Sequence, residues 1–239
     1  PEIALPGDHF NTVLYTGDGA TTQAVTGVGF APGFTWVKNR SADDKNVLVD
    51  AVRGATNYLS SNDINEEDDD STFVASLDSD GFTVGDDVVV NTNTENYVSW
   101  NWLGAASAAN TVGDIESTVR ANTTAGFSIV GYTGNGSGSN QTVGHGLSSA
   151  PEIVIVKIRS AYGDSWRVWA GDFTPDSDDN MFLNSVSLAA NTDPARILSA
   201  NATTFTLLLY NGTHAAVNKS GETYIGYCFH SIEGYSKVG

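Results

Sequence analysis

The stretch Asn96-Tyr-Val-Ser-Trp-Asn-Trp102 decides the fold, because it occurs twice. Its second copy is Thr223-Tyr-Ile-Gly-Tyr-Cys-Phe229. In both copies large apolar side chains recur at every second position, which is the period of a β-strand with two alternating faces. Aromatic residues two apart on one strand, present twice, predict core positions in two related β-sandwiches. Trp36, on another repeated strand, is expected in the same core with Trp100 and Trp102.

Four further landmarks recur around this strand in the same order. They are Tyr15-Thr-Gly-Asp-Gly19 with Tyr132-Thr-Gly-Asn-Gly136, Ala31-Pro-Gly-Phe-Thr-Trp-Val-Lys-Asn-Arg40 with Ala150-Pro-Glu-Ile-Val-Ile-Val-Lys-Ile-Arg159, Tyr58-Leu-Ser-Ser-Asn62 with Phe182-Leu-Asn-Ser185, and Gly81-Phe-Thr-Val-Gly85 with Thr204-Phe-Thr-Leu-Leu208. The spacing between the copies grows along the chain, as expected when small insertions fall in loops. An ordered set of this kind predicts a tandem duplication of one structural unit.

The connections between these landmarks are rich in glycine and asparagine, and amphipathic helices are absent from the pattern. We therefore expect an all-β fold made of two tandem β-sandwich repeats. Each repeat is expected to be lectin-like or jelly-roll-like, with antiparallel sheets and little helix. The expected boundaries are 1–112 for the first repeat, 113–125 for a linker with one strand-like or helical stretch, and 126–239 for the second repeat.

Composition excludes several classes of protein. The 239 residues include 28 acidic and 11 basic side chains, a formal net charge of −17. Such a chain repels phosphate, so we expect no nucleic-acid partner. No apolar run approaches the roughly 20 residues of a membrane helix, so we expect no membrane insertion. Cys228 is the single cysteine, which excludes an intrachain disulfide and a cysteine-based zinc site.

The acidic charge is concentrated in residues 1–112, which hold 17 acidic and 4 basic side chains. One interpretation is solubility in water or salt. The other is a divalent cation site, for which the run Glu66, Glu67, Asp68, Asp69 and Asp70 is the first candidate and Asp176-Ser-Asp-Asp179 the second. Calcium binds several carboxylate oxygens, but the EF-hand pattern is missing and the run also fits a hydrated loop. No other cofactor is expected.

Catalytic patterns are missing from the sequence. Glycoside hydrolysis needs two carboxylates placed across a cleft, and no Glu-x-Asp-x-Glu alternation occurs. Nucleophilic catalysis needs a positioned histidine beside a nucleophile, and none lies in a Gly-x-Ser-x-Gly pattern. The histidines are His9, His145, His214 and His230. We expect a protein that is not an enzyme.

The best candidates for ligand binding lie in the second repeat. Tyr162, Trp166 and Arg167 form an aromatic and polar cluster that the first repeat does not share. Trp166 and Trp169 are three residues apart and fall on opposite faces of a strand, so one of them is expected to point outward. His145, between two glycines, is the fourth candidate. The alternatives are packing under a loop for the aromatic residues and a hydrogen bond that holds the loop for His145.

The ordered motifs also carry a family resemblance. They include Gly126-Phe-Ser-Ile-Val-Gly-Tyr-Thr-Gly-Asn-Gly136, Val143-Gly-His-Gly-Leu147, Ile232-Glu-Gly-Tyr-Ser-Lys237 and Asp50-Ala-Val-Arg-Gly54. This set resembles a tandem β-sandwich domain of tailed-bacteriophage virion-surface proteins of the tail-fibre or decoration type, over nearly the whole chain. The resemblance brings no catalytic residues.

The resemblance implies a non-enzymatic structural protein at the virion surface, in a tail fibre, a head fibre or a capsid decoration. Homo-oligomers and contacts with other phage virion proteins are expected in that setting. Two roles stay open: attachment to a host surface glycan, or a decoration or structural module that docks onto a capsid or fibre. The alternative is a glycan-degrading enzyme of a tail spike.

Overall fold

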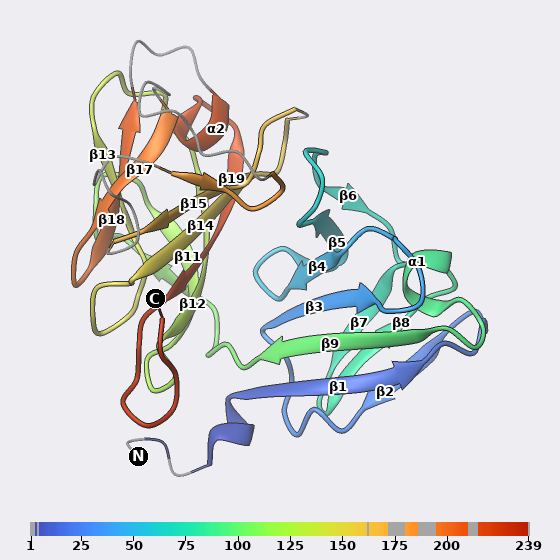
Figure 1. Cartoon of the computed structure of the whole chain (residues 1–239). Helices are drawn as coiled ribbons and strands as arrows, with labels where there is room; N and C mark the ends of the chain where they lie inside the picture. The colour runs from blue at the N-terminus through green and yellow to red at the C-terminus, as the bar shows by residue number, and fades with distance from the viewer. Residues whose placement is uncertain are drawn as a thin grey trace. The chain divides into compact units, whose positions relative to one another are not determined.

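A computed structural model describes residues 3, 5–161, 163–171, 180–185, 195–209 and 215–238. The chain divides into two compact units, both built almost entirely of antiparallel strands (Figure 1). The first sandwich comprises Ala4–Asp63 and Glu67–Gly104, and the second comprises Ala105–Gly239 with Pro1–Ile3 and Ile64–Glu66. The expected all-β sandwich fold with little helix is confirmed.

The first sandwich pairs a large sheet with a small one. The large sheet has the order β1 (Phe10–Thr16), β9 (Asn96–Trp102), β3 (Phe34–Asn39), β4 (Val47–Asp50), β5 (Gly54–Ser60) and β6 (Asp68–Asp69). The small sheet has the order β2 (Gln23–Thr26), β8 (Gly81–Val84) and β7 (Val74–Asp78). A core cluster joins Val37 and Tyr97 of the large sheet to Phe82 of the small one. The 3₁₀ helix η1 (Pro6–Asp8) precedes β1, and the short helix α1 (Val88–Asn91) precedes β9.

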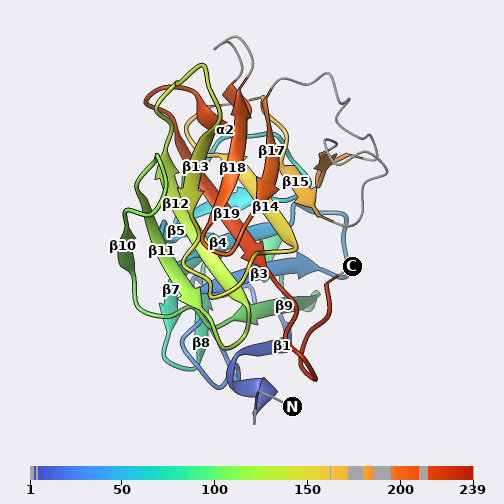
Figure 2. The same ribbon diagram turned by 90° about the vertical axis from the view of Figure 1, so that its left-hand side faces the viewer.

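The second sandwich repeats this plan. Its large sheet has the order β10 (Ala108–Asn110), β11 (Ser117–Asn122), β12 (Phe127–Thr133), β19 (Thr223–Phe229), β14 (Ile153–Ile158), β15 (Arg167–Ala170) and β16 (Met181–Phe182). Its small sheet is β13 (Gln141–Gly144), β18 (Thr204–Leu209) and β17 (Ala195–Ala200), side by side in Figure 2. The helix α2 (Ala215–Asn218) precedes β19 as α1 precedes β9. The order β1-β9-β3-β4 thus returns as β12-β19-β14-β15, and β2-β8-β7 returns as β13-β18-β17.

The boundary between the units differs from the expected one. The division falls between Gly104 and Ala105 rather than at residue 112. The expected linker, residues 113–125, contains β11, which pairs residue by residue with β12 from Ser117 opposite Tyr132 to Asn122 opposite Phe127. Because β11 and β10 extend the second large sheet beyond β12, this segment belongs to the second sandwich.

The duplicated core is built around stacked tyrosines. Tyr15 and Tyr97 have ring centroids 4.9 Å apart, and Tyr132 and Tyr224 have the same separation. A phenylalanine from the small sheet meets each pair edge-on at 6.2 Å, Phe82 in the first sandwich and Phe205 in the second. The two cores therefore match ring by ring.

The expected place of the tryptophans in this core is wrong. Tyr97 belongs to the core cluster, whereas Trp100 and Trp102 alternate with it along β9 and lie on the opposite face of the sheet. Trp36 stands opposite Trp100 in the register of β3 and β9, on that same outer face, and all three indoles are partly exposed. Both faces of these strands are apolar, so the period of two could not indicate which face meets the small sheet.

A turn clasped by a buried asparagine is also duplicated. Asn91 at the end of α1 accepts a hydrogen bond from the Asp18 N–H at 2.9 Å, and Asn218 at the end of α2 accepts one from the Asn135 N–H at 2.9 Å. In each repeat the tyrosine hydroxyl bonds the helix, from Tyr15 to Val90 O at 2.9 Å and from Tyr132 to Val217 O at 2.8 Å. The repeated order Tyr-Thr-Gly thus marks a turn that closes on the helix.

The glycine in this turn has no room for a side chain. A Cβ on Gly17 would lie 2.3 Å from the Thr92 carbonyl oxygen, and one on Gly134 would lie 2.3 Å from that of Lys219. We expect Gly17→Ala and Gly134→Ala to lower the unfolding free energy of their own sandwich by roughly 1–3 kcal/mol, because backbone must shift to accept the methyl group. Hydrogen exchange followed by mass spectrometry reports each sandwich separately. Gly138→Ala, where nothing lies within 4 Å, is the matched control and should leave exchange unchanged.

Candidate functional site

Trp166, Trp169 and Arg167, which belong to the second sandwich, are buried. Trp166 is 0% exposed and stacks on Tyr227 at a centroid distance of 6.4 Å, while Trp169 is 8% exposed and belongs to the main core cluster. The expectation that one of the two indoles points outward is therefore wrong, because β15 and the residue before it are covered on both faces. The Arg167 guanidinium lies 4.7 Å above the Phe182 ring, and Tyr162 lies outside the described residues.

His145 is buried and holds its loop, which was the alternative to ligand binding. Its Nδ1 accepts a hydrogen bond from the Leu147 N–H at 3.1 Å, so the ring proton sits on Nε2 and is donated to Asn201 O at 3.0 Å. The ring is 0% exposed. Burial lowers the pKa of His145 below its ordinary value; the hydrogen bond to Asn201 O opposes this in part, and His230 adds a smaller lowering.

A lowered histidine pKa makes stability depend on pH. Below about pH 6.5 His145 binds a proton in the unfolded chain, whereas in the folded chain it stays neutral to lower pH. The folded state therefore loses stability relative to the unfolded state as pH falls. We expect the unfolding free energy of the second sandwich to fall more between pH 7.5 and pH 5 in the wild type than in His145→Gln. Urea unfolding at both pH values measures this difference. Equal slopes in the two proteins would show that His145 is protonated freely in the folded state.

The acidic run does not converge on one point. Glu67 pairs with Arg53 at 3.0 Å, and Asp70 accepts hydrogen bonds from the Thr72 N–H and hydroxyl at 2.8 and 2.7 Å, which lower the pKa of Asp70. Glu66, Asp68 and Asp69 are exposed. In the part of the chain that the structure describes, no three His, Cys, Asp or Glu side chains are grouped to hold a metal ion. The second candidate, residues 176–179, lies outside that part.

An apolar hollow opens at one end of the second sandwich. It has a volume of about 710 Å³ and lies where β14 begins and β15 ends. Its walls come from small and apolar side chains with one indole: Ala150, Pro151, Ile153, Trp169, Ala170 and Met181. Hollows of this size and lining are typical of small-molecule sites.

A polar hollow of about 430 Å³ adjoins the apolar one. The two share Ala150 and Glu152, and we call them together the end groove. The polar part is lined by hydroxyl, carboxylate and imidazole side chains: Thr123, Thr124, Ser148, Ser149, His230, Ser231 and Glu233. An apolar wall beside hydrogen-bonding groups gives the end groove two kinds of contact within one site.

Glu152 is fixed at the junction of the two hollows. Its carboxylate accepts a hydrogen bond from the Ser231 N–H at 2.7 Å, and its backbone is held by Phe229 O at 2.8 Å and the Gly171 N–H at 3.0 Å. The Ser231 hydroxyl also donates to this carboxylate. An ionised carboxylate has further acceptor sites beyond these two bonds. Glu152 can therefore accept from a hydroxyl group placed in the groove.

His230 completes the polar wall. Its Nδ1 donates to Ser231 O at 2.9 Å, which leaves Nε2 as an acceptor. Nε2 is buried and has no hydrogen-bond partner among the described residues. A buried ring nitrogen of this kind is commonly satisfied by a water or a ligand.

Glu152 was not predicted as a site residue from the sequence, because the residues around it in the groove come from distant parts of the chain. A comparison of the two repeats could have pointed to it. In the repeated segment Ala-Pro-x, the first copy has Gly33 where the second has Glu152. The backbone bonds are the same, from Gly33 N to Trp102 O and from Glu152 N to Phe229 O, both at 2.8 Å. A carboxylate added to an otherwise identical backbone position indicates a role that the fold does not require.

Fold and site define the class: an all-β protein of two tandem sandwiches, the second of which carries a loop-lined groove at one end. The chain belongs to the family described as a domain of unknown function, DUF7483, whose model matches residues 5–239. No curated protein and no solved structure matches the chain. In the described ranges no helix is long and apolar enough to cross a membrane.

Proposed function

We propose that the chain is a non-enzymatic structural protein of a tailed-phage virion surface that binds a host surface saccharide in the end groove of its second sandwich. The observation that carries the saccharide binding is the junction at Glu152, where an apolar hollow beside Trp169 meets a hollow lined with hydroxyls and carboxylates. The virion context rests on the resemblance of the ordered motifs to tail-fibre and decoration proteins.

The chemistry of the groove suits a pyranose ring. Such a ring has C–H faces that pack on apolar and aromatic side chains, and a rim of hydroxyls that donate and accept hydrogen bonds. The Glu152 carboxylate accepts hydrogen bonds, and the Ser148 and Ser149 hydroxyls both donate and accept them. The two hollows are adjacent, so one sugar or two linked sugars can use both.

The virion assignment is tested by labelling the particle. Virion proteins form symmetric oligomers or dock onto symmetric particles, so we expect the chain to form homo-oligomers or to bind other virion proteins. Immunogold electron microscopy of purified particles should place the label on the capsid or on a fibre, and sedimentation of the isolated chain should report an oligomer. Unlabelled particles together with a monomeric chain would refute the virion assignment.

The alternative, a glycan-degrading enzyme, has a defined test. Glu152 and Glu233 both line the polar hollow and are the carboxylate pair that such an enzyme would use. The proposal expects no release of reducing ends from host polysaccharide by the wild-type chain. Release that disappears in both Glu152→Gln and Glu233→Gln would replace the binding function with an enzymatic one.

A further inference from the structure

We infer a second saccharide site on the first sandwich, specific for a sugar that carries a carboxylate. The site is the open hollow of about 560 Å³ that Lys38, Arg40, Ser41 and Trp100 line, and we call it the cationic hollow. The inference rests on the proposed saccharide binding, but its residues and its test are separate from those of the end groove.

The charges of the first sandwich point to this hollow. Residues 1–112 hold only four basic side chains among 17 acidic ones. Arg53 is buried in ion pairs with Asp50 and Glu67, and Lys45 pairs with Asp63 at 3.3 Å. The remaining two, Lys38 and Arg40, both line the cationic hollow. Neither forms an ion pair with a carboxylate of the described residues, although Asp43 also lines the hollow.

Both cations have donors to spare. The Lys38 ammonium donates to the Asp44 carbonyl oxygen at 3.3 Å, which uses one of its three hydrogens. The Arg40 side chain is exposed and can offer its planar fork to a carboxylate in a two-bond contact. A carboxylate bound between them would be held by charge and by geometry.

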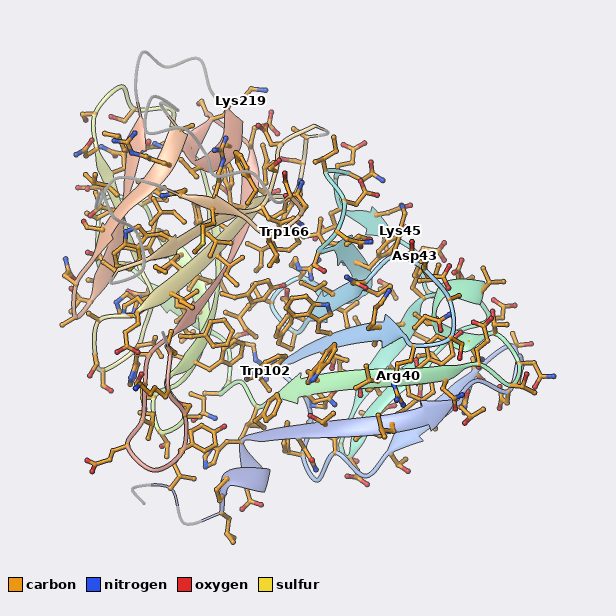
Figure 3. The ribbon with its side chains drawn as sticks, viewed as in Figure 1. Arg40, Asp43, Lys45, Trp102, Trp166 and Lys219 are labelled. Carbon is orange, nitrogen blue, oxygen red and sulfur yellow. The ribbon has the colours of Figure 1, made fainter. Side chains whose placement is uncertain are left out.

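The loop that carries Arg40 is fixed before any ligand arrives. Asn39 is buried, and its side-chain oxygen accepts hydrogen bonds from the Ser41 N–H at 2.8 Å and the Ala42 N–H at 3.2 Å. The Arg40 N–H bonds Asn96 O at 2.8 Å, which ties the loop to β9. Arg40 and Asp43, labelled in Figure 3, mark this loop. A pre-organised loop loses little entropy on binding.

Trp100 supplies the apolar wall. It lies on the same face of the large sheet as Lys38, since Lys38 stands opposite Val98 and Trp36 stands opposite Trp100 in the register of β3 and β9. Trp36 meets the Trp100 ring edge-on at 6.2 Å and holds it in place. The partly exposed indole can pack on the C–H face of a sugar ring while the cations bind its carboxylate.

Comparison with the second sandwich shows which features of the cationic hollow belong to the shared fold and which occur in the first sandwich alone. Its matching segment is Lys157-Ile-Arg-Ser-Ala161, and Arg159 N bonds Thr223 O at 2.8 Å just as Arg40 N bonds Asn96 O. The loop is therefore a property of the fold. Lys157 and the tyrosine at the place of Trp100, Tyr227, are both buried, at 0% and 1% exposure. Only the first copy keeps this lysine and this aromatic ring at an open surface.

The experiment uses trigalacturonate as the acidic probe and galactotriose as the neutral one. Calorimetry measures the binding of each probe to the full chain at low and high salt. We expect the wild type to bind trigalacturonate more tightly than galactotriose, and the doubly substituted Lys38→Gln, Arg40→Gln chain to lose at least tenfold in affinity for it. Trp100→Leu should weaken both sugars. Lys45→Gln removes one charge outside the hollow and should change affinity less than twofold.

Any of four results would overturn the inference. They are no binding of trigalacturonate by the wild type, no loss in the doubly substituted chain, an equal loss in Lys45→Gln, which would reflect net charge alone, or a loss in Ala150→Trp. Unchanged urea unfolding of the doubly substituted chain shows that a loss is not caused by unfolding. Ala150→Trp, which fills the end groove, should leave trigalacturonate affinity unchanged. A lower affinity for trigalacturonate in Ala150→Trp would show that the acidic sugar binds in the end groove. The inference would then fail while the proposed function stands.

Discussion

Arg53→Ala is expected to lower the unfolding free energy of the first sandwich by about 3–5 kcal/mol, because it removes a buried guanidinium that pairs with a buried carboxylate. Asp50 is 0% exposed, and its two carboxylate oxygens bond the Arg53 side chain and the N–H groups of Val52 and Arg53. The same guanidinium also donates to Leu48 O at 2.9 Å and Asn57 O at 3.0 Å. Its removal therefore takes away several hydrogen bonds at once.

Urea unfolding with hydrogen exchange measures this loss and assigns it to the first sandwich. Arg40→Ala is the control, since Arg40 is exposed, and we expect its effect to stay within about 0.5 kcal/mol. Arg53→Ala, Asp50→Asn together should recover part of the loss, because the buried Asp50 carboxylate is removed together with the guanidinium. A loss below about 1 kcal/mol in Arg53→Ala would mean that water replaces the guanidinium at Asp50.

Ala150→Trp is expected to abolish saccharide binding by the second sandwich, with at least a tenfold loss of affinity for host surface polysaccharide. Ala150 lines both hollows of the end groove, and an indole at this position fills the space where they meet. The Ala150 side chain is exposed, so the substitution adds bulk without overpacking the core. Surface plasmon resonance on immobilised polysaccharide gives the affinity of both proteins.

The duplication supplies the control for this variant. Ala31 precedes Pro32 as Ala150 precedes Pro151, and it is exposed in the same way, but it lines neither hollow of the end groove. Ala31→Trp should therefore bind polysaccharide like the wild type. Equal affinities for all three proteins would place the saccharide outside the end groove.

The fold was largely predictable because its landmarks are local. The alternation in β9 and β19, the Tyr-Thr-Gly turns and the Ala-Pro starts of β3 and β14 are each readable within ten residues. The choice of core face was not readable, since Tyr97 and Trp100 are both large aromatic residues on one strand. The helix α1 was not predictable either, because its three valines disfavour a helix. It forms because the Asp87 side chain caps its N-terminus and tertiary packing stabilises it.

The candidate site was less predictable because it is assembled from distant segments. Thr123, Ser148, Glu152, Trp169 and Ser231 meet in the end groove through the strand order β12-β19-β14-β15, which no local pattern reveals. The sequence favoured Trp166 and Arg167 because strand alternation implies one exposed face. That rule fails where a strand is covered on both sides, as β15 is.

A hydrogen-exchange footprint of bound host polysaccharide on the wild-type chain tests saccharide binding by the end groove most directly. We expect added protection in residues 148–153, 169–171 and 230–233, which form the groove, and we expect Ala150→Trp to lose this protection. An acidic polysaccharide should add protection in residues 38–43 as well. Protection that leaves residues 148–153 and 230–233 unchanged, or no protection with any polysaccharide of the host surface, would contradict the account.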